Sequence, residues 1–156
     1  MTTKSLMTQS QLAVQELLEG LIQDATNLLI LPELGLSRVV GQSITPESIS
    51  NPELRDFYFS CSTIDYSLVL RSQLGIFVKA CFEYQGVYHD TAIQQLRDRK
   101  KAALFRLAQM PLFYFREPAK GYLCLYLPNS SECLWEGNVY RGTRRQELQS
   151  LLFNLV

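Results

Sequence analysis

Apolar residues repeat at helical spacing near the start of the chain. Residues 10–31 carry a stripe centred on Leu17, Leu18 and Leu21, which predicts an opening amphipathic helix. Its end stays open, because residues 28–31 also fit a short strand. The chain therefore begins with a helix and a candidate strand.

The pattern then changes to the alternation typical of strands. Residues 64–70 and 74–84 are apolar and rich in β-branched or aromatic side chains, and a polar turn at 71–73 joins them into a predicted hairpin. Residues 54–61 before them fit either a strand or a short helix. Strict alternation along the second strand would place these side chains on one face: Lys79, Cys81, Glu83 and Gln85.

A second helical stripe follows Gly86. Residues 91–108 predict a helix capped by Asp90 or Thr91 and ended by Pro111. The side chains expected to face inward are Ile93, Leu96, Ala103, Leu104 and Leu107.

Strands return after this helix. Residues 112–115 and 122–127 predict strands around a turn at 117–121, and 132–140 adds a candidate edge strand. A final helix with an apolar stripe follows Thr143, which forms a capping-box pattern with Gln146. The stripe consists of Leu148, Leu151 and Leu152.

A hairpin followed by a helix-crossed connection predicts an α/β or α+β mixed sheet. The 156 residues suit a single domain, 1–156, with a core at about 54–116 and a C-terminal hairpin and helix at 117–156. The first residues lack the pattern of a secretory signal, and no apolar run is long enough to span a membrane. We expect a soluble, cytoplasmic protein without a membrane partner.

Charge and cysteine content exclude few classes of function. Fifteen basic and fifteen acidic side chains give no net field, so any nucleic-acid binding must come from local patches. The cysteines form no Cys-x-x-Cys pair, which favours reduced core thiols over a disulfide or zinc framework. They are Cys61, Cys81, Cys124 and Cys133.

Two acids on the predicted hairpin are candidates for chemistry. Asp65 begins the first strand and Glu83 lies near the end of the second, so the hairpin can bring both carboxylates to one divalent cation. Hard oxygen donors suit Mg²⁺, which can bind a phosphate and activate a water. Two acids on strands are more often surface or capping groups, so the pair alone is a weak signal.

Four segments together resemble the PD-(D/E)xK nuclease superfamily, within it the very-short-patch-repair-like branches and their relatives of unknown function. They read IDYSLVL (64–70), FEYQGVYH (82–89), LRDRKK (96–101) and MPLF (110–113). The resemblance implies a restriction-endonuclease-like mixed sheet core and a metal-dependent DNA endonuclease that hydrolyses phosphodiesters with Mg²⁺.

The resemblance also implies roles for single residues. Asp65 and Glu83 would be metal ligands, Gln85 would occupy the second charged position of the motif, and His89 would lie at the mouth of the site. Lys101 matches a helix position that contacts phosphate or orients water. Asp98 pairs with it in the helix motif.

Three positions depart from the superfamily pattern. Gln85 replaces an acid or lysine, Gln109 replaces a glycine, and Tyr114 replaces an arginine. A neutral amide supplies neither the charge of aspartate nor the proton chemistry of lysine. Lys79 or Lys101 could replace the missing cation, and superfamily members with glutamine at this position are active.

These departures leave a second hypothesis open, a catalytically inactive nuclease-derived subunit that binds DNA or serves as a protein scaffold or homo-oligomer. The basic residues are the discriminating feature, because a DNA enzyme needs several phosphate contacts. If the two basic groups converge on the carboxylates, the enzyme is favoured; if they lie on opposite sides, the scaffold is. The groups are Arg97, Arg99, Lys100 and Lys101, and Arg141, Arg144 and Arg145.

A third class of function would use aromatic strand residues as an exposed binding surface for a small molecule or a protein. The aromatic residues concerned are Phe113, Tyr114, Phe115, Tyr122 and Tyr126. Sheet core and cross-strand packing explain these rings more simply.

Overall fold

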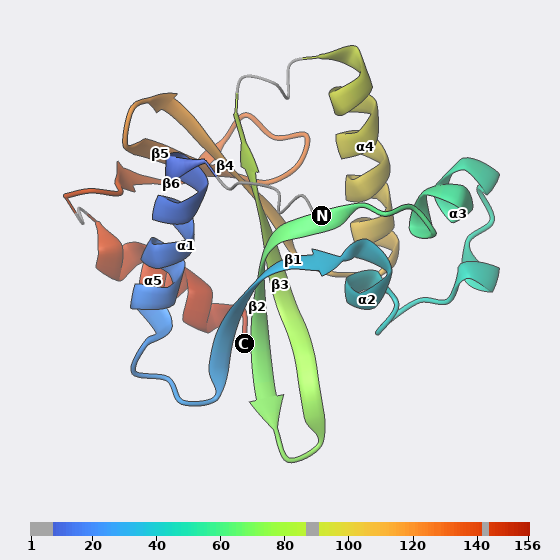
Figure 1. Cartoon of the computed structure of the whole chain (residues 1–156), viewed down its shortest axis with the longest axis horizontal. Coiled ribbons are helices and arrows are strands. Elements are labelled where there is room, and N and C mark those ends of the chain that lie inside the picture. Colours follow the sequence, from blue (N-terminus) through green and yellow to red (C-terminus); the bar gives the residue numbers. More distant parts are fainter. Residues whose placement is uncertain (1–7, 87–90, 142–143) are drawn as a thin grey trace, which may run out of the picture.

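The computed structural model describes residues 8–86, 91–141 and 144–156, which form a six-stranded sheet with helices on both faces (Figure 1). The strands are β1 (Leu28–Gly35), β2 (Thr63–Ser72), β3 (Gly75–Gln85), β4 (Leu112–Ala119), β5 (Tyr122–Tyr126) and β6 (Cys133–Asn138). The helices are α1 (Gln9–Ile22), α2 (Leu36–Val40), the 3-10 turn η1 (Pro46–Ser48), α3 (Pro52–Tyr58), α4 (Ala92–Leu107) and α5 (Arg145–Asn154).

The strands lie side by side in chain order, from β1 to β6. Every neighbouring pair is antiparallel except β3 and β4, which run parallel and are connected through α4. A parallel pair needs such a crossover. The antiparallel pairs β2–β3, β4–β5 and β5–β6 are joined by short connections, whereas α2, η1 and α3 lie between β1 and β2. The predicted mixed α/β class, with β2–β3 as a hairpin, is confirmed.

Alternation along the strands divides the apolar core into two layers. Leu18 of α1 and Leu148 of α5 pack on one face with Phe82 and Phe115. The opposite layer lies under α2, α3 and α4, and its members include Leu36, Phe57, Leu104, Cys81 and Tyr114. Each large side chain buried in this way contributes about 1.5–3 kcal/mol, so both helical layers stabilise the sheet between them. Among the described residues, no helix is long and apolar enough to cross a membrane.

The opening helix is fixed at its N-terminal end. Thr8 caps it and forms a capping box with Gln11, and the buried Tyr66 of β2 donates a hydrogen bond to the Gln11 carbonyl at 2.6 Å. The helix ends at Ile22, and the alternative of a strand from Leu28 is the correct one. The ambiguous segment at 54–61 is helical as far as Tyr58, because Asn51 caps this helix and Pro52 occupies its first position.

A β-bulge breaks the expected alternation in β3. Leu68 pairs with Ala80 but Val69 pairs with Val78, so one extra residue of β3 lies between the two pairs. Strict alternation predicts that Val78 lies on the face opposite Cys81. This prediction is wrong, because both side chains pack in the same layer. Because Lys79 is the extra residue at the bulge, strict alternation does not predict the face on which its side chain lies.

Helix α4 is capped by Thr91, whose hydroxyl accepts from the Gln94 amide at 3.2 Å. Its predicted inward stripe is wrong in part. Only the C-terminal half of the helix is buried, through Ala102, Leu104 and Phe105. Ile93, Leu96 and Leu107 are 76%, 46% and 51% exposed, respectively. A helical period predicts a face, but it does not predict how far the neighbouring layer extends along it.

The C-terminal part departs from expectation at two points. β4 continues through Ala119, so the predicted turn at 117–121 is shorter than expected. Helix α5 takes Arg144, at φ 58°, as its N-cap and has no side-chain cap, so the prediction that Thr143 caps this helix is wrong. Thr143 lies outside the described residues. The apolar stripe is confirmed, with Leu148 and Leu152 fully buried.

The cysteines are divided between core and surface. All four are free, and Cys81 and Cys124 are buried as predicted. Cys61 and Cys133 are exposed, which contradicts their assignment as core thiols. Both lie at the ends of apolar runs, where the chain leaves the core.

Candidate active site

Asp65 and Glu83 face each other across the β2–β3 hairpin. Tyr66 pairs with Phe82 in the antiparallel register, so Asp65 and Glu83 lie opposite each other at the next position. The Asp65 amide donates to Glu83 Oε2 at 3.0 Å, and the Tyr84 amide donates to Asp65 Oδ2 at 2.8 Å. Each carboxylate is thus held by the backbone of the opposite strand. This reciprocal arrangement fixes both side chains without the help of a ligand.

Burial makes it costly for both carboxyl groups to carry a negative charge. Glu83 is only 6% exposed and Asp65 is half-buried. Burial, followed by the charge of Glu83 and a hydrogen bond to it, raises the pKa of Asp65 from 3.8 to about 8. The opposing effects of the Tyr84 amide and Lys101 are smaller. Near neutral pH, the pair therefore retains one proton.

Lys101 reaches this pair from helix α4. Its ammonium group contacts Glu83 Oε1 and donates to the Thr63 carbonyl at 3.2 Å. Its side chain is 12% exposed, so the ion pair is largely shielded from water. Of the two lysines considered as replacements for the missing cation, Lys101 contacts Glu83.

Gln85 lies at the edge of the same cluster. Its amide nitrogen donates to Asp98 at 3.4 Å, and its oxygen accepts from Arg116 Nε at 3.1 Å. Gln94 also donates to Asp98, at 3.3 Å. The side chain of Gln85 is therefore engaged as a bridge between α4 and β4.

Arg116 is a further candidate residue, one that the sequence motifs do not single out. The parallel β3–β4 register places Tyr114 opposite Glu83 and Arg116 opposite Gln85. The exposed guanidinium also lies over the Tyr126 ring, 4.7 Å from its centroid. Strand alternation was the available signal, because Arg116 follows Tyr114 by two residues and so shares its face.

Tyr114 itself lies below this surface. It is 5% exposed, and burial, together with the charges of Asp98 and Glu83, raises the pKa of its hydroxyl. A buried phenol does not offer the phosphate contact that an arginine would. Arg116 is therefore the cation of β4 that is available on this face.

The two basic groups lie on opposite faces of the sheet, although Lys101 of the first group contacts Glu83. α4, with Arg97, Arg99 and Lys100, covers one face of the sheet, whereas α5, which begins at Arg145, covers the other (Figure 1). Arg144 forms ion pairs with Glu136 and Glu147 instead. His89 lies outside the described residues.

Asp65 and Glu83 bring two carboxyl groups to one point, partly withdrawn from water. Carboxylate oxygens are the donors that a hard divalent cation takes. The pair would hold Mg²⁺ after Asp65 releases its proton and Lys101 yields one oxygen of Glu83.

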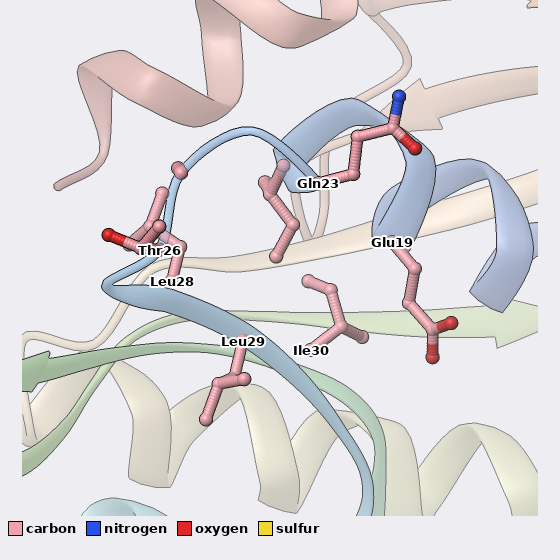
Figure 2. A pocket seen from close by; sticks show the side chains of 8 residues that line it. Glu19, Gln23, Thr26, Leu28, Leu29 and Ile30 are labelled. Atoms are coloured by element: carbon pink, nitrogen blue, oxygen red, sulfur yellow. The ribbon is translucent and has the colours of Figure 1, made fainter.

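A separate pocket of about 380 Å³ lies where α1 passes into β1 (Figure 2). Glu19, Gln23 and Thr26 contribute its polar groups, and Leu28 and Ile30 contribute apolar surface. Leu28 pairs with Leu70, five residues along β2 from Asp65, or roughly 17 Å at the rise of a strand. The pocket is therefore not part of the carboxylate site.

Comparison with known proteins adds no relative to this description. No family model matches the chain, and no curated protein or solved structure shows significant similarity to it.

Proposed function

We propose that the protein is a Mg²⁺-dependent nuclease that hydrolyses phosphodiesters of DNA. The observation that carries this proposal is the meeting of Asp65, Glu83 and Lys101 at one point, from β2, β3 and α4. Two carboxylates and a lysine are the three charged groups of the PD-(D/E)xK motif, which the sequence resembles. The lysine comes from the helix instead of from the second position after Glu83.

The topology supports the same proposal. The acids lie on two strands of one hairpin, and α4 then crosses to β4, which is parallel to β3. The order of hairpin, helix and parallel strand is the one that the resemblance to a restriction-endonuclease-like core implies.

Each residue would have a distinct role. Asp65 and Glu83 would hold the cation, which supplies Lewis acidity and lowers the pKa of a bound water. Lys101 would stabilise negative charge that develops on the phosphate, where a pre-oriented cation in a water-poor site is effective. Arg116, stacked on Tyr126, would hold the nucleic-acid backbone beside the carboxylates.

A second candidate function is a nuclease-derived subunit that binds DNA or a protein without cleaving. It is favoured by the opposite placement of the two basic groups and by the engagement of Gln85 with Arg116. It differs from the first in one respect that can be measured, the use of the carboxylates as metal ligands.

The test is cleavage of supercoiled DNA, single-stranded DNA and RNA by the full chain in Mg²⁺ or Mn²⁺. The proposal predicts nicking or cleavage that stops with a chelator and is lost in Asp65→Ala and Glu83→Ala. Asp24→Ala, an exposed acid in the connection between α1 and β1, is the matched control and should retain activity. Cleavage that survives in Asp65→Ala would contradict the proposal. DNA binding without cleavage, and without metal binding that depends on Asp65 and Glu83, would favour the second candidate.

A further inference from the structure

Two thiols and a carboxylate meet on the β5–β6 hairpin, on the far side of β4 from Glu83. The Sγ atoms of Cys124 and Cys133 and a carboxylate oxygen of Glu136 lie within 4.8 Å of one another. No other described part of the chain brings three such groups together at this spacing.

A β-bulge creates this cluster. Cys124 pairs with Glu136, and Leu125 pairs with Trp135, but Tyr126 pairs with Cys133, so β6 gains one residue at Leu134. Cys133 and Glu136 are three positions apart, which in a regular strand would turn them to opposite faces. The extra residue brings them to the same face, beside Cys124.

We propose that Cys124, Cys133 and Glu136 form a zinc-binding site, independent of the carboxylate site. Thiolates select zinc and other thiophilic ions over Mg²⁺, which prefers oxygen donors. Zinc–sulfur bonds of about 2.3 Å would require the ligand atoms to draw together by roughly 1 Å, which side-chain rotation can supply. Three protein ligands leave the fourth tetrahedral position to water.

The surroundings suit this role. Tyr122 lies close enough to Glu136 for this carboxylate to raise the pKa of the Tyr122 hydroxyl. Arg144 lies 3.8 Å from the same carboxylate, with both side chains 46% exposed. Two thiolates, a carboxylate, Zn²⁺ and this guanidinium sum to zero charge. The exposed Cys133 makes the site open to solvent, whereas Cys124 anchors it in the sheet.

Zinc held here would tie the edge strand β6 to β5. The site is separated from the carboxylates by β4, since Cys124 pairs with Arg116, which in turn pairs with Gln85. Its occupancy should therefore raise the thermal stability of the chain without requiring Asp65 or Glu83.

Titration of the reduced full chain with Co²⁺ tests the proposal. Co²⁺ bound by thiolates shows a near-ultraviolet charge-transfer band. Co²⁺ bound by carboxylates alone does not show this band. We expect one equivalent to develop the band, and Zn²⁺ to abolish it and raise the melting temperature. Cys133→Ser should weaken metal binding at least about tenfold. Losing a metal ligand should reduce the affinity more than losing a residue that only hydrogen-bonds to a ligand. Glu136→Gln should weaken binding while keeping a thiolate band.

Cys133 is exposed, so its substitution leaves the core intact and the variant should fold. Cys61→Ser, which removes an exposed thiol outside the cluster, is the control and should bind like the native chain. Absence of the band in folded native protein would overturn the proposal, as would native affinity in Cys133→Ser.

Discussion

The ammonium group of Lys101 in α4 contacts the carboxylate of Glu83 in β3, and both side chains are largely shielded from water, at 12% and 7% exposure. The cation that the motif would place two residues after Glu83 is thus supplied from the crossing helix. Position 85 is left free for a glutamine that bridges Asp98 and Arg116.

Lys101→Met should destabilise the protein by about 3 kcal/mol, because it leaves Glu83 buried without its cation. Denaturant unfolding followed by circular dichroism measures this change. Lys100→Met, one residue along the same helix, is the matched control and should change stability by less than about 0.5 kcal/mol. Equal stability of the two variants would contradict a buried Lys101–Glu83 pair.

Asp65→Asn should raise stability in the absence of metal and remove a pH dependence. Folded Asp65 keeps its proton to about pH 8, whereas in the unfolded chain it loses the proton near its ordinary pKa of 3.8. The folded state therefore binds more protons in this window, so native stability falls as pH rises from about 4 to about 8. Melting temperatures across this range, with Asp24→Asn as the exposed control, measure the effect. A native melting temperature that rises toward pH 8 would refute the assignment.

Arg116→Gln should weaken binding to DNA and reduce the salt dependence of binding by about one unit of slope, the loss of one phosphate contact. Fluorescence anisotropy at several salt concentrations provides the slope. Mg²⁺ binding without DNA should be unchanged, because Arg116 contacts Gln85 and not the carboxylates. Arg71→Gln, at the exposed end of β2, is the comparison variant. If the salt dependence of DNA binding falls equally in both variants, Arg116 has no specific role in DNA binding.

Tyr66→Phe should cost about 1–2 kcal/mol, since it removes the buried hydrogen bond that joins β2 to the Gln11 carbonyl of α1. Its hydroxyl points to the layer opposite Lys101, so Mg²⁺ binding should persist. Chemical denaturation and calorimetry on the same variant check both expectations. Unchanged stability would mean that α1 is not held by this contact.

Much of the fold could be predicted because the local patterns are strong. The β2–β3 hairpin and α4 follow from alternation, helical spacing and the Thr91 cap. The bulge at Val78 could not be foreseen, since one inserted residue leaves no compositional mark. The exposure of Ile93 was also hidden, because it depends on where the neighbouring layer ends.

The candidate site could be predicted in part for a related reason. Asp65, Glu83 and Lys101 were named from spacing and resemblance, and the structure brings them together. The zinc-ligand cluster was missed because its thiols lie nine positions apart and meet only through the register of β5 and β6. Pairing across strands is tertiary information that a single sequence does not carry.

Calorimetric titration of the native protein with Mg²⁺ or Mn²⁺, beside Asp65→Ala and Glu83→Ala, tests the central claim most directly. We predict binding at millimolar affinity or tighter that either substitution abolishes, with Asp24→Ala binding like the native chain. Absence of binding by folded native protein, both with and without DNA, would contradict the claim that these two carboxylates hold a catalytic metal.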